Sequence, residues 1–232
     1  MPRSCRIYLP GVPSHVTVRG NDKQDIVRCD GDRLRLVDVL RAVSRNNGLA
    51  IHAYVVMSNH VHLLATGARP ESLPKAIQAV GRRYVSYFNS RYARTGTLWE
   101  GRYKASLVIT EEYLVNCHRY IEFNPVRGGM VDAPADFPWS SHRFYAGGQP
   151  DDLVTPHECW LSLGNTDAER REIYRSVASQ PLADDVIASI RLSTRQGWAI
   201  GSDQDCKALE AAIGRRVTAI GSGWKKGRPR RA

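Results

Sequence analysis

Long apolar segments and closely spaced cysteines are both missing from this chain of 232 residues. No stretch approaches the ~20 apolar residues that a membrane-spanning helix requires, and residues 1–15 lack the apolar run of a secretory signal peptide. The five cysteines are far apart and form no C-x-x-C pair, which argues against a disulfide framework and against a zinc ribbon. These absences predict a protein of the reducing cytoplasm with no membrane partner.

Acidic residues are also in short supply. The 33 lysines and arginines outnumber the 23 aspartates and glutamates, so the formal net charge is +10. Such a basic chain favours a polyanionic partner, above all nucleic acid, although a generally basic surface gives the same count. The chain is long enough for one ordinary domain with an extension or for two small domains. Hydrophobic residues make up 42% of the sequence, which is enough to form a buried core.

Hydrophobic periodicity predicts the order strand, helix, strand, strand, helix, strand, followed by a further helix. The expected strands are 14–20, 49–57, 58–66 and 102–109, and the expected helices are 32–48, 70–96 and 111–124. This is the order of a ferredoxin-like, or RRM-like, α+β fold, in which two helices cover one face of an antiparallel sheet. The other face is expected to stay open, as it does in many nucleic-acid platforms.

The composition changes at about residue 131. Residues 132–152 are rich in Pro, Gly and Asp and are expected to form an irregular connector. Three short helices are expected after it, over 167–179, 184–194 and 203–214. We therefore divide the chain into a first domain (1–146), a mostly helical C-terminal extension (147–223) and a basic tail (224–232).

The segment MSNHVHLLAT, Met57 to Thr66, holds two histidines two residues apart. In a strand, residues i and i+2 point to the same face, so His60 and His62 project together while Val61 faces the core. Paired imidazoles can hold one metal ion between them. Two half-buried histidines at a sheet edge explain the pattern equally well, so the motif alone leaves both interpretations open.

A tyrosine and an amide are predicted on one face of the helix that follows the last strand. Tyr120 and Asn124 are four residues apart, so a hydroxyl and an amide oxygen would be presented together. Glu122 is a competing carboxylate ligand, but it lies about 200° around the helix from Tyr120, which favours Asn124. Most tyrosines in helices serve only in packing. Packing in the apolar stripe of the long helix already explains Tyr84, Tyr87 and Tyr92.

These groups together suit phosphodiester chemistry. A divalent ion neutralises a non-bridging phosphate oxygen, and a tyrosine is a better leaving group than an alkoxide, so its phosphate ester can be resealed. Two neutral imidazoles and one amide oxygen leave coordination positions open and suit Mg²⁺ or Mn²⁺.

Four motifs occur in order along the chain: MSNHVHLLAT, LWEGRYKASLV, YIEFNPVRGGMV and FPWSSHRFY. With HVTVRGND near the N-terminus, they resemble the HUH single-tyrosine transposases, in which U is a hydrophobic residue, and more narrowly the REP-associated tyrosine transposases of bacteria. The resemblance spans about residues 7–146, which would form the transposase domain. It implies His60 and His62 as metal ligands, Tyr120 as the nucleophile and Asn124 as the third ligand, with Mg²⁺ or Mn²⁺ as cofactor.

The resemblance also implies an activity. Relatives cut and rejoin single-stranded DNA that forms hairpins, through a covalent 5′-phosphotyrosine link and without a nucleotide cofactor. They lean towards a monomer, although other single-tyrosine transposases exchange helices between two subunits. A bacterial, nucleoid-associated protein follows. Two alternatives stay open: a hairpin-binding protein that does not cleave, and a metallo-phosphodiesterase that uses water.

Basic residues near these motifs are candidate DNA contacts. They are Arg19, Arg82, Arg83, Arg102 and Lys104, together with Lys225, Lys226, Arg228 and Arg230 in the tail. A solvated surface explains any single one of them equally well. The tail sequence KKGRPRR has the Gly-Arg-Pro core of an AT-hook-like arm for a narrow minor groove, with a nonspecific basic tail as the alternative.

Overall fold

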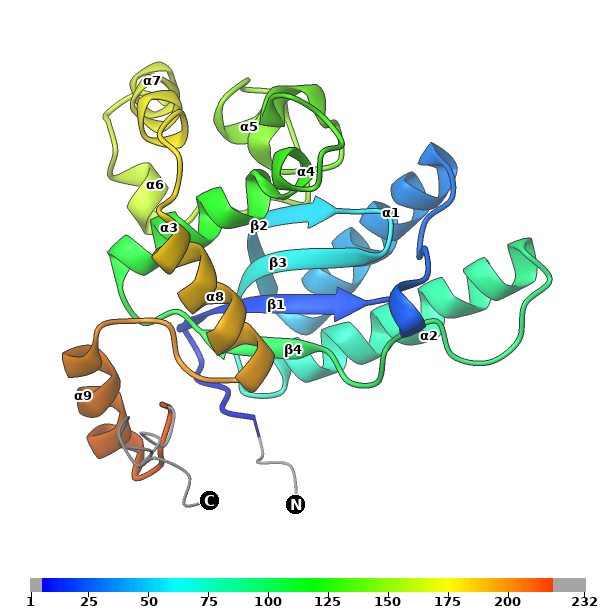
Figure 1. Cartoon of the computed structure of the whole chain (residues 1–232), viewed down its shortest axis with the longest axis horizontal. Coiled ribbons are helices and arrows are strands. Elements are labelled where there is room, and N and C mark those ends of the chain that lie inside the picture. The colour runs from blue at the N-terminus through cyan, green and yellow to red at the C-terminus, as the bar shows by residue number, and fades with distance from the viewer. Residues whose placement is uncertain (1–5, 219–232) are drawn as a thin grey trace, which may run out of the picture.

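The computed structural model describes residues 6–218 and contains one four-stranded antiparallel sheet (Figure 1). The strands are β1 (Pro13–Arg19), β2 (Leu49–Val56), β3 (His60–Gly67) and β4 (Lys104–Leu107). They lie in the order β2-β3-β1-β4, and every pairing is antiparallel. This is the ferredoxin-like topology, so the predicted α+β fold class is confirmed.

Helices α1 (Asp30–Asn47) and α2 (Ser72–Arg91) cover one face of the sheet (Figure 1). Val61 and Leu63 of β3 point to this face and join the apolar stripes of both helices in the largest core, as the period of two predicted. The first helix ends at Asn47 and is capped by Gly48, whose φ of 60° lies in the left-handed region that favours glycine.

The predicted end of the second helix was wrong. α2 stops at Arg91 rather than at Gly96. The Tyr92 N–H still bonds the Phe88 carbonyl oxygen, but the next residue, Ala93, has a left-handed φ of 48°, which ends the helical geometry before the glycine is reached. The Tyr92 hydroxyl donates a 2.6 Å hydrogen bond to the buried Asp32 carboxylate of α1.

The second face of the sheet is not open, contrary to the prediction. Helices α3 (Glu111–Glu122) and α8 (Asp184–Gln196) lie across it, α3 against β2 and β3 and α8 against β4 and β1 (Figure 1). Leu64 of the sheet packs there with Leu114 and Ile190 of the two helices. Both helices have an apolar stripe that must be buried, and the outward apolar residues of the sheet provide the matching surface.

The C-terminal extension is helical, as predicted. Its helices are α6 (Glu158–Leu161), α7 (Asp167–Ala178), α8 and α9 (Asp203–Ile213). The predicted first domain holds the short helical segments η1 (Asn21–Lys23), α4 (Asn124–Arg127), η2 (Pro134–Asp136) and α5 (His142–Tyr145). The division at residue 146 stays a prediction, but α8 shares a core with the sheet. None of the helices within residues 6–218 combines the length and apolar character needed to cross a membrane. The predicted arm at 224–232, with Lys225, Lys226, Arg228 and Arg230, lies outside the described residues.

Candidate functional site

The end of α3 is shaped by its local sequence. The helix starts at Thr110, whose hydroxyl accepts the Tyr113 N–H, and it ends at Glu122. The chain turns at Phe123 and resumes as α4, with Pro125 in its first turn, where a missing N–H is tolerated. The sequence had suggested that Asn124 shares a helix with Tyr120. In the structure Asn124 begins a second helix, because proline cannot continue the hydrogen-bond ladder of α3.

A pocket of about 620 Å³ opens beside β1 and β3, between α3, α4 and α8. Its lining includes all four residues proposed for the chemistry, which are His60, His62, Tyr120 and Asn124. The ring centroids of His60 and His62 are 4.9 Å apart, and those of His62 and Tyr120 are 5.6 Å apart. The two imidazoles, the phenol and the amide therefore converge within one chain.

Hydrogen bonds fix both imidazole rings by their Nδ1 atoms. The Nδ1 atom of His60 lies 2.6 Å from Asn59 Oδ1. The Nδ1 atom of His62 lies 2.9 Å from His15 Nε2 and 3.0 Å from Thr17 Oγ1. Within the described part of the chain, no protein group bonds Nε2 of His62.

Burial holds these histidines in the neutral form. It lowers the pKa of His60 to about 4 and the pKa of His15 to about 3. The pKa of His62 falls well below its ordinary value, because of burial first and then the neighbouring His15 and His60. Neutral imidazole is the form that binds metals. Residues 6–218 contain no group of three or more His, Cys, Asp or Glu side chains suited to a metal ion, so a cation here would need the Asn124 amide oxygen as well.

The guanidinium group of Arg127, in α4, contacts both the ring and the backbone of Tyr120. Its guanidinium carbon lies 4.4 Å from the centroid of the tyrosine ring, and its NH2 group donates to the Tyr120 carbonyl oxygen. Burial lowers the pKa of Arg127 to about 10, so it remains a cation at neutral pH. A cation over the ring stabilises negative charge on the phenol oxygen. Arg127 was not among the predicted site residues.

Cations dominate the rest of the pocket wall. Among residues 6–218, the lining contains Arg19, Arg102, Lys104, Arg127, Arg191 and Arg195, and one carboxylate, that of Glu100. Three of the predicted DNA contacts, Arg19, Arg102 and Lys104, thus lie at the site. Arg82 and Arg83 do not: both are exposed on α2, in the helical layer behind the opposite face of the sheet.

Helix α8 supplies pocket residues that were not among the predicted site residues. Arg191, Thr194 and Arg195 have the spacing i, i+3, i+4, so they share one helix face. That spacing was visible in the sequence, but nothing there told which surface the face would meet. Thr194 Oγ1 lies 2.8 Å from Nδ1 of His15, across 179 residues of sequence.

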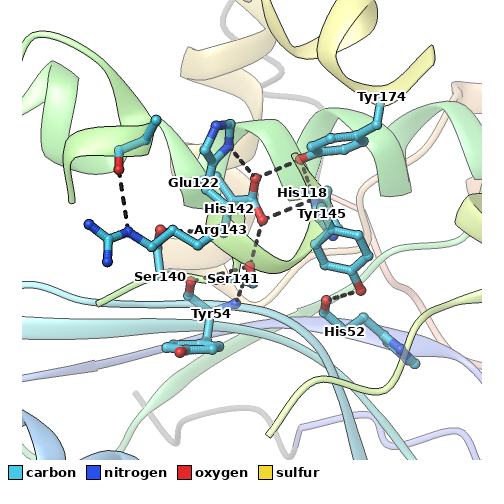
Figure 2. Close-up of polar contacts among 11 residues, drawn as sticks. His52, Tyr54, His118, Glu122, Ser140, Ser141, His142, Arg143, Tyr145 and Tyr174 are labelled. Atoms are coloured by element: carbon cyan, nitrogen blue, oxygen red, sulfur yellow. Dashed lines mark hydrogen bonds and ion pairs between the residues drawn. The ribbon is translucent and has the colours of Figure 1, made fainter. Parts of the chain in front are cut away.

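Glu122 does not line the pocket, and its carboxylate lies in a separate buried cluster (Figure 2). Its carboxylate accepts hydrogen bonds from Ser141 Oγ at 2.6 Å, His142 Nδ1 at 2.9 Å and the Tyr174 hydroxyl at 2.6 Å. Burial alone would raise the pKa of Glu122, but His118, His142 and Ser141 lower it further than burial raises it. The cluster ties the end of α3 to α5 and α7, and so fixes the segment that carries Tyr120 and Asn124.

Comparison with known proteins gives consistent results. The family described as "Transposase IS200 like" matches residues 10–124, a range that contains all four proposed residues. The ISDra2 transposase TnpA of Deinococcus radiodurans is 30% identical over 93 residues, which are 38% of this chain and 66% of that protein, just under two thirds. A REP-associated tyrosine transposase, solved bound to a REP hairpin, superposes with a TM-score of 0.51 over 68% of this chain and 93% of that one, at 21% identity. This last likeness supports the fold, and α8 lies beyond the matched family range.

Proposed function

We propose that this chain, a member of the IS200-like single-tyrosine transposases, cleaves and rejoins single-stranded DNA through Tyr120. The observation that carries the proposal is the convergence of Tyr120 with His60 and His62 in one cationic pocket.

Tyr120 is the proposed nucleophile. Its hydroxyl loses a proton and its oxygen attacks the scissile phosphorus, while the bond to the 3′-oxygen of the preceding nucleotide breaks. The product is a 5′-phosphotyrosine and a free 3′-hydroxyl, and attack by a 3′-hydroxyl on the ester releases Tyr120 and reseals the strand. Arg127, with its guanidinium over the Tyr120 ring, stabilises the negative charge that the phenol oxygen carries before attack and after release.

His60, His62 and Asn124 are the proposed ligands of Mg²⁺ or Mn²⁺. The fit rests on two imidazoles held neutral by burial and on an amide that lines the same pocket. When bound, the ion supplies charge neutralisation at a non-bridging oxygen of the scissile phosphate. None of the three ligands is charged, and a neutral set of mixed nitrogen and oxygen ligands suits an ion that acts together with a phosphate.

Hairpin-forming, repetitive palindromic DNA is the proposed substrate. The motif resemblance to REP-associated transposases supports it, and the related solved structure is of a transposase bound to a REP hairpin. Arg19, Arg102 and Lys104 line the pocket and would neutralise phosphates next to the cleavage point. Arg82 and Arg83 on α2, and the tail cations Lys225, Lys226, Arg228 and Arg230, are proposed contacts for DNA outside the pocket.

We further propose that the enzyme works as a monomer, without a nucleotide cofactor, on DNA of the bacterial nucleoid. The support for a monomer is that the proposed nucleophile and all three proposed ligands come from the same chain. A second subunit is not needed to complete the pocket.

The test is incubation of the protein with single-stranded hairpin oligonucleotides and Mn²⁺, followed by denaturing electrophoresis. A 5′-phosphotyrosine link retains the downstream fragment, so a 3′-end label should migrate with the protein and a 5′-end label should not. Cleaved fragments without any adduct would support the water-using phosphodiesterase, and binding without cleavage would support the non-cleaving DNA-binding protein. The same reaction with EDTA is the control.

A further inference from the structure

We propose that helix α8 sets the position of the proton on His62: Thr194 and His15 form a hydrogen-bond relay that keeps this proton on Nδ1 and leaves Nε2 free for a divalent ion. The inference rests on the metal site of the proposed function. Thr194 and His15 are positioning residues here, because they act through His62.

The relay consists of three consecutive short contacts. His62 Nδ1 lies 2.9 Å from His15 Nε2, His15 Nδ1 lies 2.8 Å from Thr194 Oγ1, and Thr194 Oγ1 lies 2.8 Å from the Ile190 carbonyl oxygen. The three side chains are almost fully buried, with exposures of 6% for His62, 1% for His15 and 5% for Thr194. Water therefore does not compete strongly for these contacts.

The last group of the relay fixes its direction. A carbonyl oxygen can only accept, so the Thr194 hydroxyl donates its one hydrogen to Ile190 and accepts from His15 Nδ1–H. A neutral imidazole has one N–H, so His15 Nε2 carries a lone pair and must accept from His62 Nδ1–H. His62 is then left with a lone pair on Nε2, and the opposite direction would place a proton on that atom and block metal binding.

His60 also carries its proton on Nδ1, but a different acceptor is responsible. The Asn59 amide nitrogen donates to the Lys23 carbonyl at 3.2 Å, which turns its Oδ1 towards His60. Oδ1 can only accept, so His60 Nδ1 carries the proton. The acceptor for His60 is its neighbour in sequence, whereas the acceptor for His62 is supplied by α8 through His15.

Thr17 also contacts His62 Nδ1, at 3.0 Å, but its rotatable hydroxyl can either donate or accept. The Thr17 hydroxyl is therefore compatible with either tautomer of His62 and does not select one. Only the path through His15 and Thr194 ends in an acceptor-only group, and Thr194 belongs to a helix outside the matched family range of 10–124. The C-terminal extension thereby becomes a working part of the site.

The wild-type protein tests the relay directly. With ¹⁵N-labelled histidine and no metal, at mildly alkaline pH, nitrogen chemical shifts should show His15 and His62 both protonated on Nδ1. A proton on Nε2 of His62 would overturn the proposal without any variant.

The variant Thr194→Val removes the hydroxyl at nearly constant volume. We expect a mixture of His15 tautomers and a loss of Mn²⁺ affinity of about 10-fold or more, the usual effect of removing such a supporting partner, as measured by calorimetry. Thr194→Ser keeps the hydroxyl and should restore both. Thr95→Val, at an exposed position outside the pocket, is the matched control, and thermal unfolding of each variant reports folding.

Two results separate this inference from the proposed function. Wild-type tautomers and wild-type Mn²⁺ affinity in Thr194→Val would refute the relay while leaving the transposase proposal intact. A wild-type protein that forms no covalent adduct would refute the transposase proposal, while the nitrogen spectra would still decide the relay.

Discussion

The rings of Tyr120 and His62 meet edge to face in one chain, with their centroids 5.6 Å apart and their planes at 89°. Tyr120 comes from α3 and His62 from β3, and the contact exists because α3 packs on the face of the sheet that carries the histidines. His15 of β1 completes the same arrangement, with its ring centroid 5.5 Å from that of Tyr120. A phenol is thereby placed beside a metal-competent imidazole without a second subunit.

Tyr120→Phe should abolish the covalent adduct and leave hairpin binding unchanged. The substitution removes only the hydroxyl, so the ring keeps its contacts with Arg127 and His62. Adduct formation is measured by denaturing electrophoresis and binding by fluorescence anisotropy. An adduct of wild-type yield would assign the nucleophile to another residue, and metal-dependent hydrolysis without an adduct would favour a water nucleophile.

His60→Ala should remove the stabilisation that Mn²⁺ gives to the folded protein. A ligand that binds only the folded state stabilises it by about 2.7 kcal/mol at 100 times its dissociation constant, so the wild-type melting temperature should rise with Mn²⁺ and the variant's should not. Differential scanning calorimetry measures this. Excess EDTA should cancel the rise in the wild type, and an undiminished rise in the variant would place the ion elsewhere.

The double variant Arg102→Gln/Lys104→Gln should weaken the binding of single-stranded DNA and reduce its salt dependence. Each phosphate contact on a single strand contributes a slope of about −0.7 in log K against log salt, so two lost contacts should reduce the slope by about 1.4. Arg82→Gln/Arg83→Gln removes the same charge from α2, away from the pocket. Equal effects of the two pairs on an oligonucleotide too short to leave the pocket would contradict the assigned binding surface.

Glu122→Gln should destabilise the protein by about 1–3 kcal/mol, the usual cost of leaving buried polar groups unsatisfied. An amide has one acceptor oxygen and cannot accept from Ser141, His142 and Tyr174 as the carboxylate does. Urea unfolding measures the change in the free energy of unfolding. Glu112→Gln, an exposed position on the same helix, should change it by less than about 0.5 kcal/mol, and similar values for the two variants would contradict a structural role for the cluster.

Stability should fall as the pH drops from about 6.5 towards 4. Burial lowers the pKa of His52 to about 4, and His15 and His60 are lowered for the same reason. Between the ordinary histidine pKa and these values the unfolded chain binds protons that the folded chain does not, so acid favours unfolding. Urea midpoints across this range test the slope, and His52→Gln should make it shallower. A flat profile would mean that these histidines bind protons equally in the folded and unfolded states.

Local periodicity was enough to predict much of the fold. Alternation placed His60 and His62 on one face and Val61 on the other, and the positions of the helices and strands gave the ferredoxin-like order. Both features depend on residues close together in sequence. One error arose at a single backbone conformation, because Ala93 takes a left-handed φ of 48° and ends α2 before Gly96. The other arose where distant segments intervened, because the apolar stripes of α3 and α8 covered the face expected to be open.

The sequence by itself determined the types of chemical group available, the spacing of the two imidazoles and the strongly positive charge, because these depend on composition and on the repeat of a single strand. Only the tertiary structure decided which groups meet. It brought Thr194 to His15 across 179 residues, directed Glu122 into its own buried cluster and left Arg82 and Arg83 behind the sheet. Such contacts follow from the burial of apolar faces against one another, and the pattern of a single segment does not contain the identity of its partner.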